Sequence, residues 1–493
     1  MATQIEFGTS GWRAVLAEEF TFANVRRAVH GIARYVSAQK PSGARIKVIV
    51  GRDPRFLGET FCAMAADILS SYGITPLVIA EPAPAPAISY AVIQSKADGA
   101  INFTAGHNPP EYNGIKFSTP DGAPALPEVT TSIEFEIAAI FADATPQAPH
   151  ITNAEVQSQS EPQPQSIDPR RMYLSRLREI VDLDVIEKAG VKIAFDPMWG
   201  AARGYFDALL REAGVTVASV HDTRDVLFGG HAPEPDDLLL EDPPLEDLRL
   251  EDLRCKMREM GAGIGTGIGI ATDGDAGRFG IVDGDGTFFQ PNYILALLFD
   301  YLVETRGWTN GVGKSVVTTN LINALAERHK IALYETPVGF KYIGELIKQD
   351  KILIGGEESA GVSIRKHVPE KDGVLAGLLC CEMVARRGVS LGEQLADLFA
   401  EVGSYYPSRE NFRLTPEAKQ KFTEKLRGDP SEFYGIKVAQ AVRIDGLKLV
   451  LADGSWVCYR LSGTESVVRV YSEARSRDGL AKLSAAAKAW IFD

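Results

Sequence analysis

The stretch TFANVRRAVHGIARYVSA (21–38), followed closely by RIKVIV (45–50), decides the fold class. In the first segment apolar residues recur every three or four positions, which is typical of a helix with one buried face. The second segment is a short apolar run of the kind that forms a buried strand. Similar runs return at GVKIAF (190–195), KSVVTT (314–319) and KILIG (351–355). This alternation predicts α/β domains with largely parallel sheets.

The length of the chain, 493 residues, is too great for one hydrophobic core. A segment rich in Pro, Gln and Ser at 143–166 predicts a linker after the first domain. VDGDGTFFQ (282–290) is typical of a hairpin and precedes a second boundary. From Tyr406 onward the pattern changes, because LKLVLADGSWVCYRLSG (447–463) places two strand-like runs around an Asp-Gly turn. We therefore expect four domains, at 1–145, 167–288, 289–405 and 406–493.

Composition disfavours two classes of partner. The formal net charge of −13 disfavours nucleic acid or an anionic membrane, since both favour a basic surface. A local group of Arg and Lys can still bind a small anion. Five cysteines show neither metal-binding spacing nor a disulfide framework, and Cys380 and Cys381 fall in an apolar helical stretch typical of a core. With no signal-peptide pattern and no membrane-length apolar run, we expect a cytoplasmic protein.

Four polar, glycine-containing loops follow strand-like runs: TAGHNPPEYNGIKF (104–117), TDGDAGR (272–278), GEESAG (356–361) and SGTESVVR (462–469). Ligands of open α/β sheets bind at the carboxyl ends of strands, where loops from several strands can reach one cleft. The sequence therefore predicts a single site assembled between domains.

Two of these loops contain carboxylates that are candidate ligand-binding groups. Asp273 and Asp275, separated by a glycine, can ligate one Mg²⁺ through oxygen, although the same residues would also make a surface turn. The nearby DGDG (283–286) lies between two strand-like runs and is interpreted as a turn. Glu357 and Ser359 combine an acceptor with a hydroxyl, which suits the neighbouring hydroxyls of a sugar or, equally, a helix cap.

The last loop has the parts of a phosphate-binding nest, with two hydroxyls, a glycine and flanking arginines. These residues are Arg460, Ser462, Gly463, Thr464 and Arg469. GTSGWR (8–13) and GRDPR (51–55) are further turns with arginines, for which an ion-paired surface turn is the alternative. In LLLEDPPLEDLRLEDLR (238–254) the triplet Leu-Glu-Asp recurs every five residues, a step that fits neither helix nor strand. We interpret it as a surface insertion rather than a binding element, and GAGIGTGIGIATD (261–273) after it should end in a buried strand.

In chain order, FGTSGWR, GRDPRF, TAGHNPPEYNGIKF, TDGDAGRFG, VGFKYIGE, GGEESAG, HVPEKDG and RLSGTES together resemble the phosphohexomutase family. That family contains the phosphoglucomutases, phosphomannomutases and phosphoglucosamine mutases, and the resemblance covers nearly the whole chain. It implies three related α/β domains with mixed sheets and a C-terminal α+β domain around a central cleft. It also implies phosphoryl transfer between the 1- and 6-positions of a hexose through a phosphoserine, a bisphosphorylated intermediate such as glucose 1,6-bisphosphate, and Mg²⁺.

The resemblance also implies roles for individual residues. Those at the transfer centre are His107, Asn108, Lys116 and Arg278, with His367 or Lys371 assisting proton transfer. The metal ligands are Asp273 and Asp275. The substrate-binding residues are Thr9, Arg13, Lys341, Glu357, Ser359, Arg460, Ser462, Gly463, Thr464 and Arg469.

Two departures from the family's pattern fall on the chemistry. The phosphorylated serine is Gly106 here, and the third metal-binding aspartate is Gly277. Glycine can neither attack nor carry a phosphoryl group. Three explanations stay open: an altered copy of an active mutase, a catalytically inactive sugar-phosphate-binding pseudoenzyme, or substitution by another group such as Thr104, which lies two residues away from the nucleophile position. With Glu358 after Glu357 and no histidine after the serine, this loop resembles the phosphoglucomutase-like branch of the family, in which the resemblance implies glucose as the preferred hexose and mannose as the second.

Overall fold

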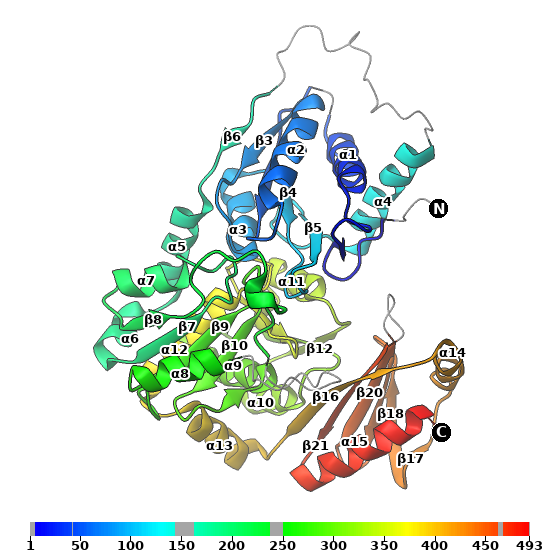
Figure 1. Cartoon of the computed structure of the whole chain (residues 1–493). Helices are drawn as coiled ribbons and strands as arrows, with labels where there is room; N and C mark the ends of the chain where they lie inside the picture. Colours follow the sequence, from blue (N-terminus) through cyan, green and yellow to red (C-terminus); the bar gives the residue numbers. More distant parts are fainter. Residues whose placement is uncertain (1–4, 42, 143–161, 237–249, 462–466, 493) are drawn as a thin grey trace.

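The computed structural model describes residues 5–41, 43–142, 162–236, 250–461 and 467–492, and within these ranges the strands form four sheets (Figure 1). The first domain lies above the second and third, and the C-terminal domain lies to their side (Figure 1). The sheets of the first three domains are mixed, while the fourth is antiparallel. The predicted fold class is confirmed. The domain boundaries stay a prediction.

The first sheet has the strand order β1-β5-β4-β2-β3-β6. Its strands are β1 (Trp12–Val15), β2 (Ile46–Arg52), β3 (Ile74–Val78), β4 (Ala100–Phe103), β5 (Tyr112–Ser118) and β6 (Gln165–Ser166). Its helices are α1 (Phe22–Ala38), α2 (Gly58–Ser71), α3 (Ala85–Ser95) and α4 (Pro127–Ala142). Helix α1 begins where the sequence predicted it, because the Thr21 hydroxyl accepts a hydrogen bond from the Asn24 N–H and caps the helix.

The second sheet has the order β11-β10-β9-β7-β8. Its strands are β7 (Lys192–Asp196), β8 (Val217–Ser219), β9 (Gly267–Thr272), β10 (Phe279–Asp283) and β11 (Phe288–Phe289). The helices of this region are α5 (Pro169–Ile180), α6 (Leu183–Ala189), α7 (Phe206–Glu212), η1 (Phe228–Gly230) and α8 (Glu251–Glu259). Strands β10 and β11 pair antiparallel around 283–286, so the predicted hairpin is present.

The third sheet has the order β13-β12-β14-β15. Its strands are β12 (Gly311–Ser315), β13 (Leu333–Thr336), β14 (Ile352–Glu357) and β15 (Gly361–Ile364). Its helices are α9 (Pro291–Arg306), α10 (Leu321–His329), α11 (Phe340–Lys348), α12 (Gly373–Arg387) and α13 (Leu391–Val402).

These three sheets share one arrangement, which places their functional loops alike. Each contains three neighbouring parallel strands and a fourth strand that is antiparallel to the third. In order, these series are β3-β2-β4-β5, β8-β7-β9-β10 and β13-β12-β14-β15. The loops 104–111, 273–278 and 358–360 each connect the last two strands of this series. Equivalent positions in the three domains therefore present the loops for which the sequence predicted phosphoserine-type, metal-binding and sugar-binding roles.

The fourth sheet, of order β16-β21-β20-β19-β18-β17, is antiparallel throughout. Its strands are β16 (Tyr406–Arg413), β17 (Glu432–Phe433), β18 (Ile436–Val442), β19 (Leu447–Leu451), β20 (Trp456–Leu461) and β21 (Val467–Ala474). Its helices are α14 (Pro416–Lys425) and α15 (Arg477–Phe492). Strand β16 begins at Tyr406, where the sequence pattern changes, and β19 and β20 form the predicted hairpin.

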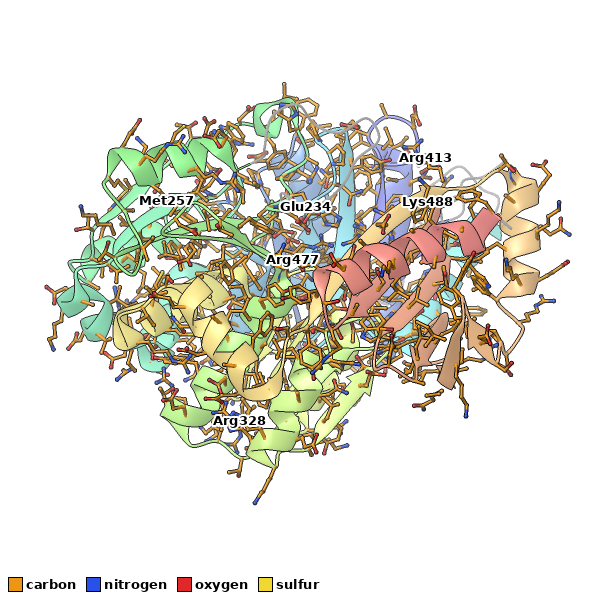
Figure 2. The ribbon with its side chains drawn as sticks, turned by 90° about the horizontal axis from the view of Figure 1, so that it is seen from below. Glu234, Met257, Arg328, Arg413, Arg477 and Lys488 are labelled. Atoms are coloured by element: carbon orange, nitrogen blue, oxygen red, sulfur yellow. The ribbon has the colours of Figure 1, made fainter. Side chains whose placement is uncertain are left out.

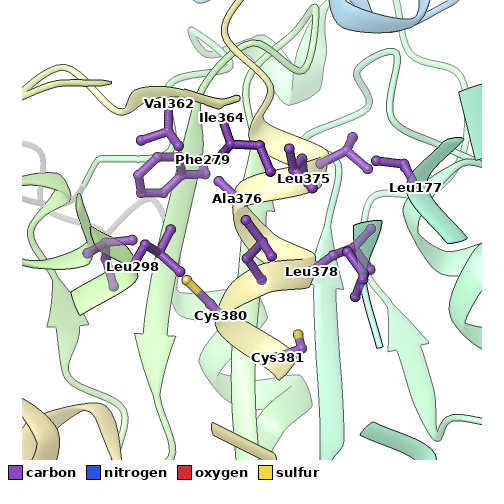
Figure 3. Packing of buried hydrophobic residues seen from close by; sticks show 14 of the residues in the cluster. Leu177, Phe279, Leu298, Val362, Ile364, Leu375, Ala376, Leu378, Cys380 and Cys381 are labelled. Atoms are coloured by element: carbon purple, nitrogen blue, oxygen red, sulfur yellow. The ribbon is translucent and has the colours of Figure 1, made fainter. Parts of the chain in front are cut away.

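Helix α12 lies in the largest hydrophobic cluster, which is continuous through the first three domains. Cys380 and Cys381 are fully buried there, beside Leu378 and Leu298 (Figure 3). All five cysteines are free thiols. The prediction that this pair belongs to the core is confirmed. None of the helices in the described ranges combines the length and apolar character that a bilayer crossing requires.

One predicted strand was displaced. The sequence placed it at 314–319, but β12 ends at Ser315, and the Lys314 ammonium donates to the carbonyls of Thr318 and Thr319 in a turn. Val316 and Val317 are buried against Trp456 of the fourth domain instead of in a sheet. A buried apolar pair at a domain contact therefore has the same sequence pattern as a strand.

Two interpretations of irregular segments also need correction. Residues 237–249, with two of the three Leu-Glu-Asp triplets, lie outside the described residues. The end of that segment is no surface insertion, because Leu250 and Leu253 are fully buried and α8 packs on β7 and β9. The linker is described only from residue 162, and its last residues form β6, which pairs in parallel with β3. Strand β9 is buried, as expected.

Candidate active site

One cavity is lined by residues from all four domains. Its volume, about 160 Å³, is several times that of a water molecule. Seven of the side chains on its wall are Arg or Lys, and three are Asp or Glu. The cations are Arg13, Lys116, Arg278, Lys371, Arg409, Arg460 and Arg469, and the carboxylates are Asp273, Glu357 and Glu358. The excess of positive charge suits an anionic ligand, although the whole chain is acidic.

The backbone of the loop between β4 and β5 is held in place by hydrogen bonds from Arg55. This guanidinium is fully buried and donates to the carbonyl oxygens of Gly106 (2.8 Å), Asn108 (2.5 Å), Pro109 (2.7 Å) and Tyr112 (2.9 Å). It also forms an ion pair of 3.1 Å with Asp53, which is buried as well. The alternative of a surface turn at GRDPR therefore fails for Arg55, since its buried side chain holds the backbone of the loop that contains Gly106.

Gly106 lies at the bottom of this loop with φ of +59°, a conformation in which a residue with a Cβ is strained. An added Cβ would nevertheless have room, because its nearest neighbours would be Asp273 Oδ2 at 3.7 Å and Asp275 at 3.8 Å. The Thr104 hydroxyl is fully buried, donates to Asp53 (2.6 Å) and accepts the Gly106 N–H (2.9 Å). Thr104 is thus engaged in holding the loop and does not face the cavity.

The two aspartates of the loop between β9 and β10 are buried side by side. Burial, and then the charge of Asp275, raises the pKa of Asp273 to about 7. Burial acts to raise the pKa of Asp275 too, but the ammonium groups of Lys116 and Lys371 outweigh it and hold that pKa below its usual range. Lys116 Nζ hydrogen-bonds Asp275 directly. The negative charge of the two aspartates is therefore balanced by lysine side chains.

Glu234 connects two of the predicted transfer-centre residues. Both of its oxygens accept from Arg278 Nη1, at 2.9 and 2.7 Å, and Oε2 lies 3.5 Å from His107 Nε2. Burial, with the positive charges of Arg278, Arg13 and Lys116, lowers the pKa of His107 well below its usual range. Figure 2 shows the labelled Glu234 near the middle of the molecule. The Glu234 carboxylate therefore orients the Arg278 guanidinium, while the His107 side chain stays a neutral imidazole.

The third domain contributes the carboxylate of Glu357, whose Oε1 accepts the Gly339 N–H at 2.7 Å. Burial, and then repulsion from Glu358, raises the pKa of Glu357 to about 7. The native state therefore holds this proton up to a higher pH than the unfolded chain, for which the ordinary value is 4.5. Stability is lost as the pH rises from about 4.5 to about 7, and the full penalty is present above that window.

We expect the Glu357→Gln variant to be more stable than the unaltered chain at pH 8, by roughly 3 kcal/mol, because each unit of pKa shift corresponds to about 1.4 kcal/mol. Below pH 5 the difference should fall under about 1 kcal/mol, since the carboxyl is then protonated in the native state. Calorimetric melting at both pH values measures this. Glu187→Gln, which removes an exposed carboxylate, is the matched control, and an equal pH response of both variants would contradict the assignment.

The fourth domain presents Arg409 from β16, Arg460 from β20 and Arg469 from β21. Arg460 forms an ion pair of 2.8 Å with Asp445. The Nε atoms of Arg409 and Arg460 are buried and have no hydrogen-bond partner among the described residues. A buried N–H donor without a partner costs about 1–3 kcal/mol, so an acceptor that entered the cavity and reached these atoms would stabilise them.

The structure brings most of the predicted site residues to this one cavity. Those on its wall are Thr9, Arg13, His107, Lys116, Asp273, Arg278, Glu357, Ser359, Arg460 and Arg469. Asn108 accepts a hydrogen bond from Arg13 at 2.7 Å. Asp275 is buried just behind the wall, and Lys341 lines a small adjoining pocket. Ser462, Gly463 and Thr464 lie outside the described residues.

His367, predicted to assist proton transfer, does not line the cavity. Its Nε2 lies 2.7 Å from Asp372 Oδ2, and its ring packs near Tyr173 and Tyr90. Asp372 also accepts from the Tyr173 hydroxyl (2.8 Å) and caps α12 through the Leu375 N–H. Lys371, the alternative named with His367, does line the cavity.

Comparison with known proteins decides the family. Models of the phosphoglucomutase/phosphomannomutase domains match in order: α/β/α domain I at 4–143, domain II at 171–286, domain III at 290–402 and the C-terminal domain at 411–489. The chain belongs to the phosphoglucomutase/phosphomannomutase family.

Individual relatives of this family support the assignment. A phosphoglucomutase of Komagataeibacter xylinus is 30% identical, over 96% of this chain and 88% of its own. The solved structure of a Thermus thermophilus protein, assigned as a phosphomannomutase, is 30% identical with a TM-score of 0.81 and covers both chains fully. An N-acetylphosphoglucosamine mutase of Aspergillus fumigatus, solved with GlcNAc-6P and magnesium, shares 14% identity and a TM-score of 0.53, with 99% of this chain and 96% of that chain covered. The last likeness shows the fold alone.

Members of this family are expected to hold Mg²⁺ near the transferred phosphate, but the residues here do not fit a resident divalent cation. No group of three or more His, Cys, Asp or Glu side chains in the described ranges gathers to bind a metal. Gly277 offers no ligand, and Asp275 Oδ2 is already bonded to Lys116 and lies 3.3 Å from the Thr104 hydroxyl. Mg²⁺ prefers about six oxygen ligands, and with Lys116 bonded to one of only two carboxylates, nearly all of them would have to come from water or from a bound ligand.

Sequence reasoning missed two residues of the site. Glu234 was overlooked because PEP in HAPEPDD (231–237) has no spacing that indicates a partner, although a carboxylate between two prolines is an unusual loop. Arg409 was overlooked because SRENFR (408–413) has the pattern of an ordinary polar strand. Alternation along β16 could have placed Arg409 on one face of the strand, but it could not have shown which face meets the cavity.

Proposed function

We propose that this chain is a phosphohexomutase-type protein that binds hexose 1-phosphates and hexose 6-phosphates, with glucose preferred and mannose second, and that its turnover is impaired. The observation that carries the proposal is the single cavity in which arginines of the fourth domain face the basic groups of the first and second. Relatives named as phosphoglucomutase and phosphomannomutase support the hexose phosphate as the ligand class.

Each part of the cavity has a task in this proposal. Arg409, Arg460 and Arg469 bind the phosphate that does not react, since guanidinium groups bond phosphate oxygens in pairs. Glu357 accepts hydrogen bonds from sugar hydroxyls, and Ser359 beside it adds a hydroxyl. The Glu358 that follows, with no histidine after Ser359, supports glucose as the preferred sugar.

The groups around Gly106 would surround the reacting phosphate. Arg13, Lys116 and Arg278 place positive charge where negative charge develops during transfer, and the neutral His107 imidazole can hydrogen-bond a phosphate oxygen. Residue 106 has no atom that could form the bond to phosphorus. The phosphoryl group therefore has nowhere on the protein to be carried while the sugar turns around, and turnover stays low.

A pseudoenzyme whose product is the bound complex is the second candidate, and one observation favours it. Thr104, the hydroxyl nearest to Gly106 in sequence, is buried and occupied by Asp53 and the Gly106 N–H. A phosphorylated residue found by mass spectrometry between 103 and 117 after incubation with glucose 1,6-bisphosphate would exclude this candidate in favour of an enzyme.

Calorimetric titration with glucose 1-phosphate, glucose 6-phosphate and mannose 6-phosphate tests the proposed function. We expect binding of all three, tightest for the glucose phosphates, and a loss of about a hundredfold in Arg469→Met, because charge-assisted hydrogen bonds to phosphate are removed. Arg413→Met is the control, since Arg413 is an exposed arginine of the same domain (Figure 2). Absence of binding for every sugar phosphate, or an equal effect of the two variants, would refute the proposal.

A further inference from the structure

Lys371 occupies the space that a third metal-binding side chain would need. A Cβ added at Gly277 would lie 3.0 Å from Lys371 Cε and 3.2 Å from its Cγ, which is closer than ordinary packing allows. The Lys371 side chain is 12% exposed, and its ammonium lies 3.0 Å from Glu370 Oε1. The glycine at 277 and this position of Lys371 therefore depend on each other.

A second ammonium group, that of Lys116, forms a hydrogen-bonded ion pair with Asp275. A Cβ added at Gly277 would also lie 3.3 Å from Asp275 Oδ1, so this carboxylate and the end of Lys371 flank the same point, and Lys371 lines the cavity together with Asp273. The charges of both lysines therefore act on both aspartates. Two ammonium groups thus act on two carboxylates, with the charge of Lys371 shared with Glu370. Together these covalently attached groups supply part of the positive charge that one divalent cation would bring.

Gly106 leaves an open place beside these charges. The nearest atom to a Cβ built there would be Asp273 Oδ2 at 3.7 Å, so the position is not filled by any neighbouring side chain of the described ranges. The resemblance to the family implies a phosphoserine at this place, whose charge the surrounding cations would balance. Here Arg13, Lys116 and Arg278 line the same cavity without a phosphate on the protein. An anion that enters with the ligand can take that place.

The fourth domain offers a second place for phosphate. The buried Nε atoms of Arg409 and Arg460 have no partner among the described residues, and Arg469 lines the cavity with them. A hexose monophosphate brings one phosphate to these cations, whereas a bisphosphate brings two. The second phosphate should appear as selectivity for the doubly phosphorylated sugar.

We propose that the cavity is a metal-independent receptor for a hexose 1,6-bisphosphate, in which Lys116 and Lys371 replace the divalent cation and the ligand supplies the phosphate that residue 106 cannot carry. The proposal rests on the proposed function, because it takes the cavity to be the hexose-phosphate site. Beyond that function, the proposal names the bisphosphate as the selected ligand and the lysines as the groups that replace a divalent cation.

Titration of the full chain with glucose 1,6-bisphosphate and with the two glucose monophosphates, each in EDTA and in millimolar Mg²⁺, tests this inference. We expect the bisphosphate to bind about a hundredfold more tightly than either monophosphate, because a second set of charge-assisted hydrogen bonds forms. Its affinity should change less than about twofold between EDTA and Mg²⁺, since two lysines already balance the aspartates.

Two variants separate the roles of the lysine and the glycine. Lys371→Met should weaken bisphosphate binding at least about tenfold and monophosphate binding much less, whereas Lys366→Met, which removes an exposed lysine of the same loop, should change neither. Gly277→Asp should displace Lys371 and add a third carboxylate, so its bisphosphate affinity should fall at least about tenfold in EDTA compared with Mg²⁺.

The outcomes are distinguishable. Bisphosphate binding in the unaltered chain that is lost in EDTA would overturn the inference and leave the proposed function standing, as would equal affinity for bisphosphate and monophosphates. Failure of every sugar phosphate to bind would refute the proposed function itself. Selective binding in EDTA, with Mg²⁺ dependence gained only in Gly277→Asp, is the result that supports the inference.

Discussion

The double variant Gly106→Ser/Gly277→Asp is expected to convert glucose 1-phosphate at least about a thousandfold faster than the unaltered chain, when glucose 1,6-bisphosphate is present to phosphorylate the new serine. The unaltered chain lacks the atom that would carry the phosphoryl group. The serine restores that atom, and the aspartate restores a third carboxylate for a metal ion. Each single variant should recover far less, because the two substitutions supply different parts of one step.

The backbone tolerates both changes. Serine at 106 accepts a φ of +59°, at a cost of about 1–2 kcal/mol, and its Cβ meets no atom nearer than 3.7 Å among the described residues. Gly277 does not have a positive φ, and the atoms in the way of its new Cβ belong to the flexible end of Lys371. The lysine can move, since its side chain has several rotatable bonds.

A coupled assay that follows glucose 6-phosphate measures the rates. The matched control is Gly106→Ala/Gly277→Asp, which carries the same backbone strain and the same added carboxylate but no hydroxyl. It should stay as slow as the unaltered chain. Equal rates for the serine and alanine forms, or for the serine form and the unaltered chain, would show that residue 106 is not the position on which turnover depends.

The sequence located the functional loops because each follows a strand-like run and contains glycine beside polar residues. That rule is local, so it holds for the loops that begin after Phe103, Thr272 and Glu357. It could not show that these loops occupy the same position in three sheets, since strand order depends on pairing between residues far apart in the chain. The equivalence of β4, β9 and β14 appears only in the structure.

Partners that lie far away in sequence account for what was missed. Arg55 and Asp53, two residues apart, look like an exposed ion pair, but the carbonyls that bury Arg55 lie more than 50 residues later. The environment of His367 is set by Tyr173, which comes from helix α5 of another domain. Charge and residue type therefore identified most residues of the cavity wall. They did not identify the residues that hold the wall in place.

Arg55→Met is expected to destabilise the first domain by roughly 3–5 kcal/mol, which is the cost of breaking a buried ion pair. The change leaves Asp53 as a buried charge without its partner and removes donors from four carbonyl oxygens of the loop that contains Gly106. The melting temperature should fall by about 10 °C or more. Binding of hexose phosphates should weaken in the protein that remains folded, because the loop loses its fixed position.

Asp53→Asn combined with Arg55→Met distinguishes the lost charge pair from the lost carbonyl contacts. If the unpaired carboxylate is the main cost, removing its charge should restore part of the melting temperature, since burial already raises the pKa of Asp53 and disfavours its ionised form. The remaining deficit then belongs to the four carbonyls. Arg45→Met, at an exposed arginine just before β2, is the control and should melt within about 2 °C of the unaltered chain. If Arg55→Met melted as high as this control, the loop would have to be held by its own backbone turns, and Arg55 would have no part in positioning residue 106.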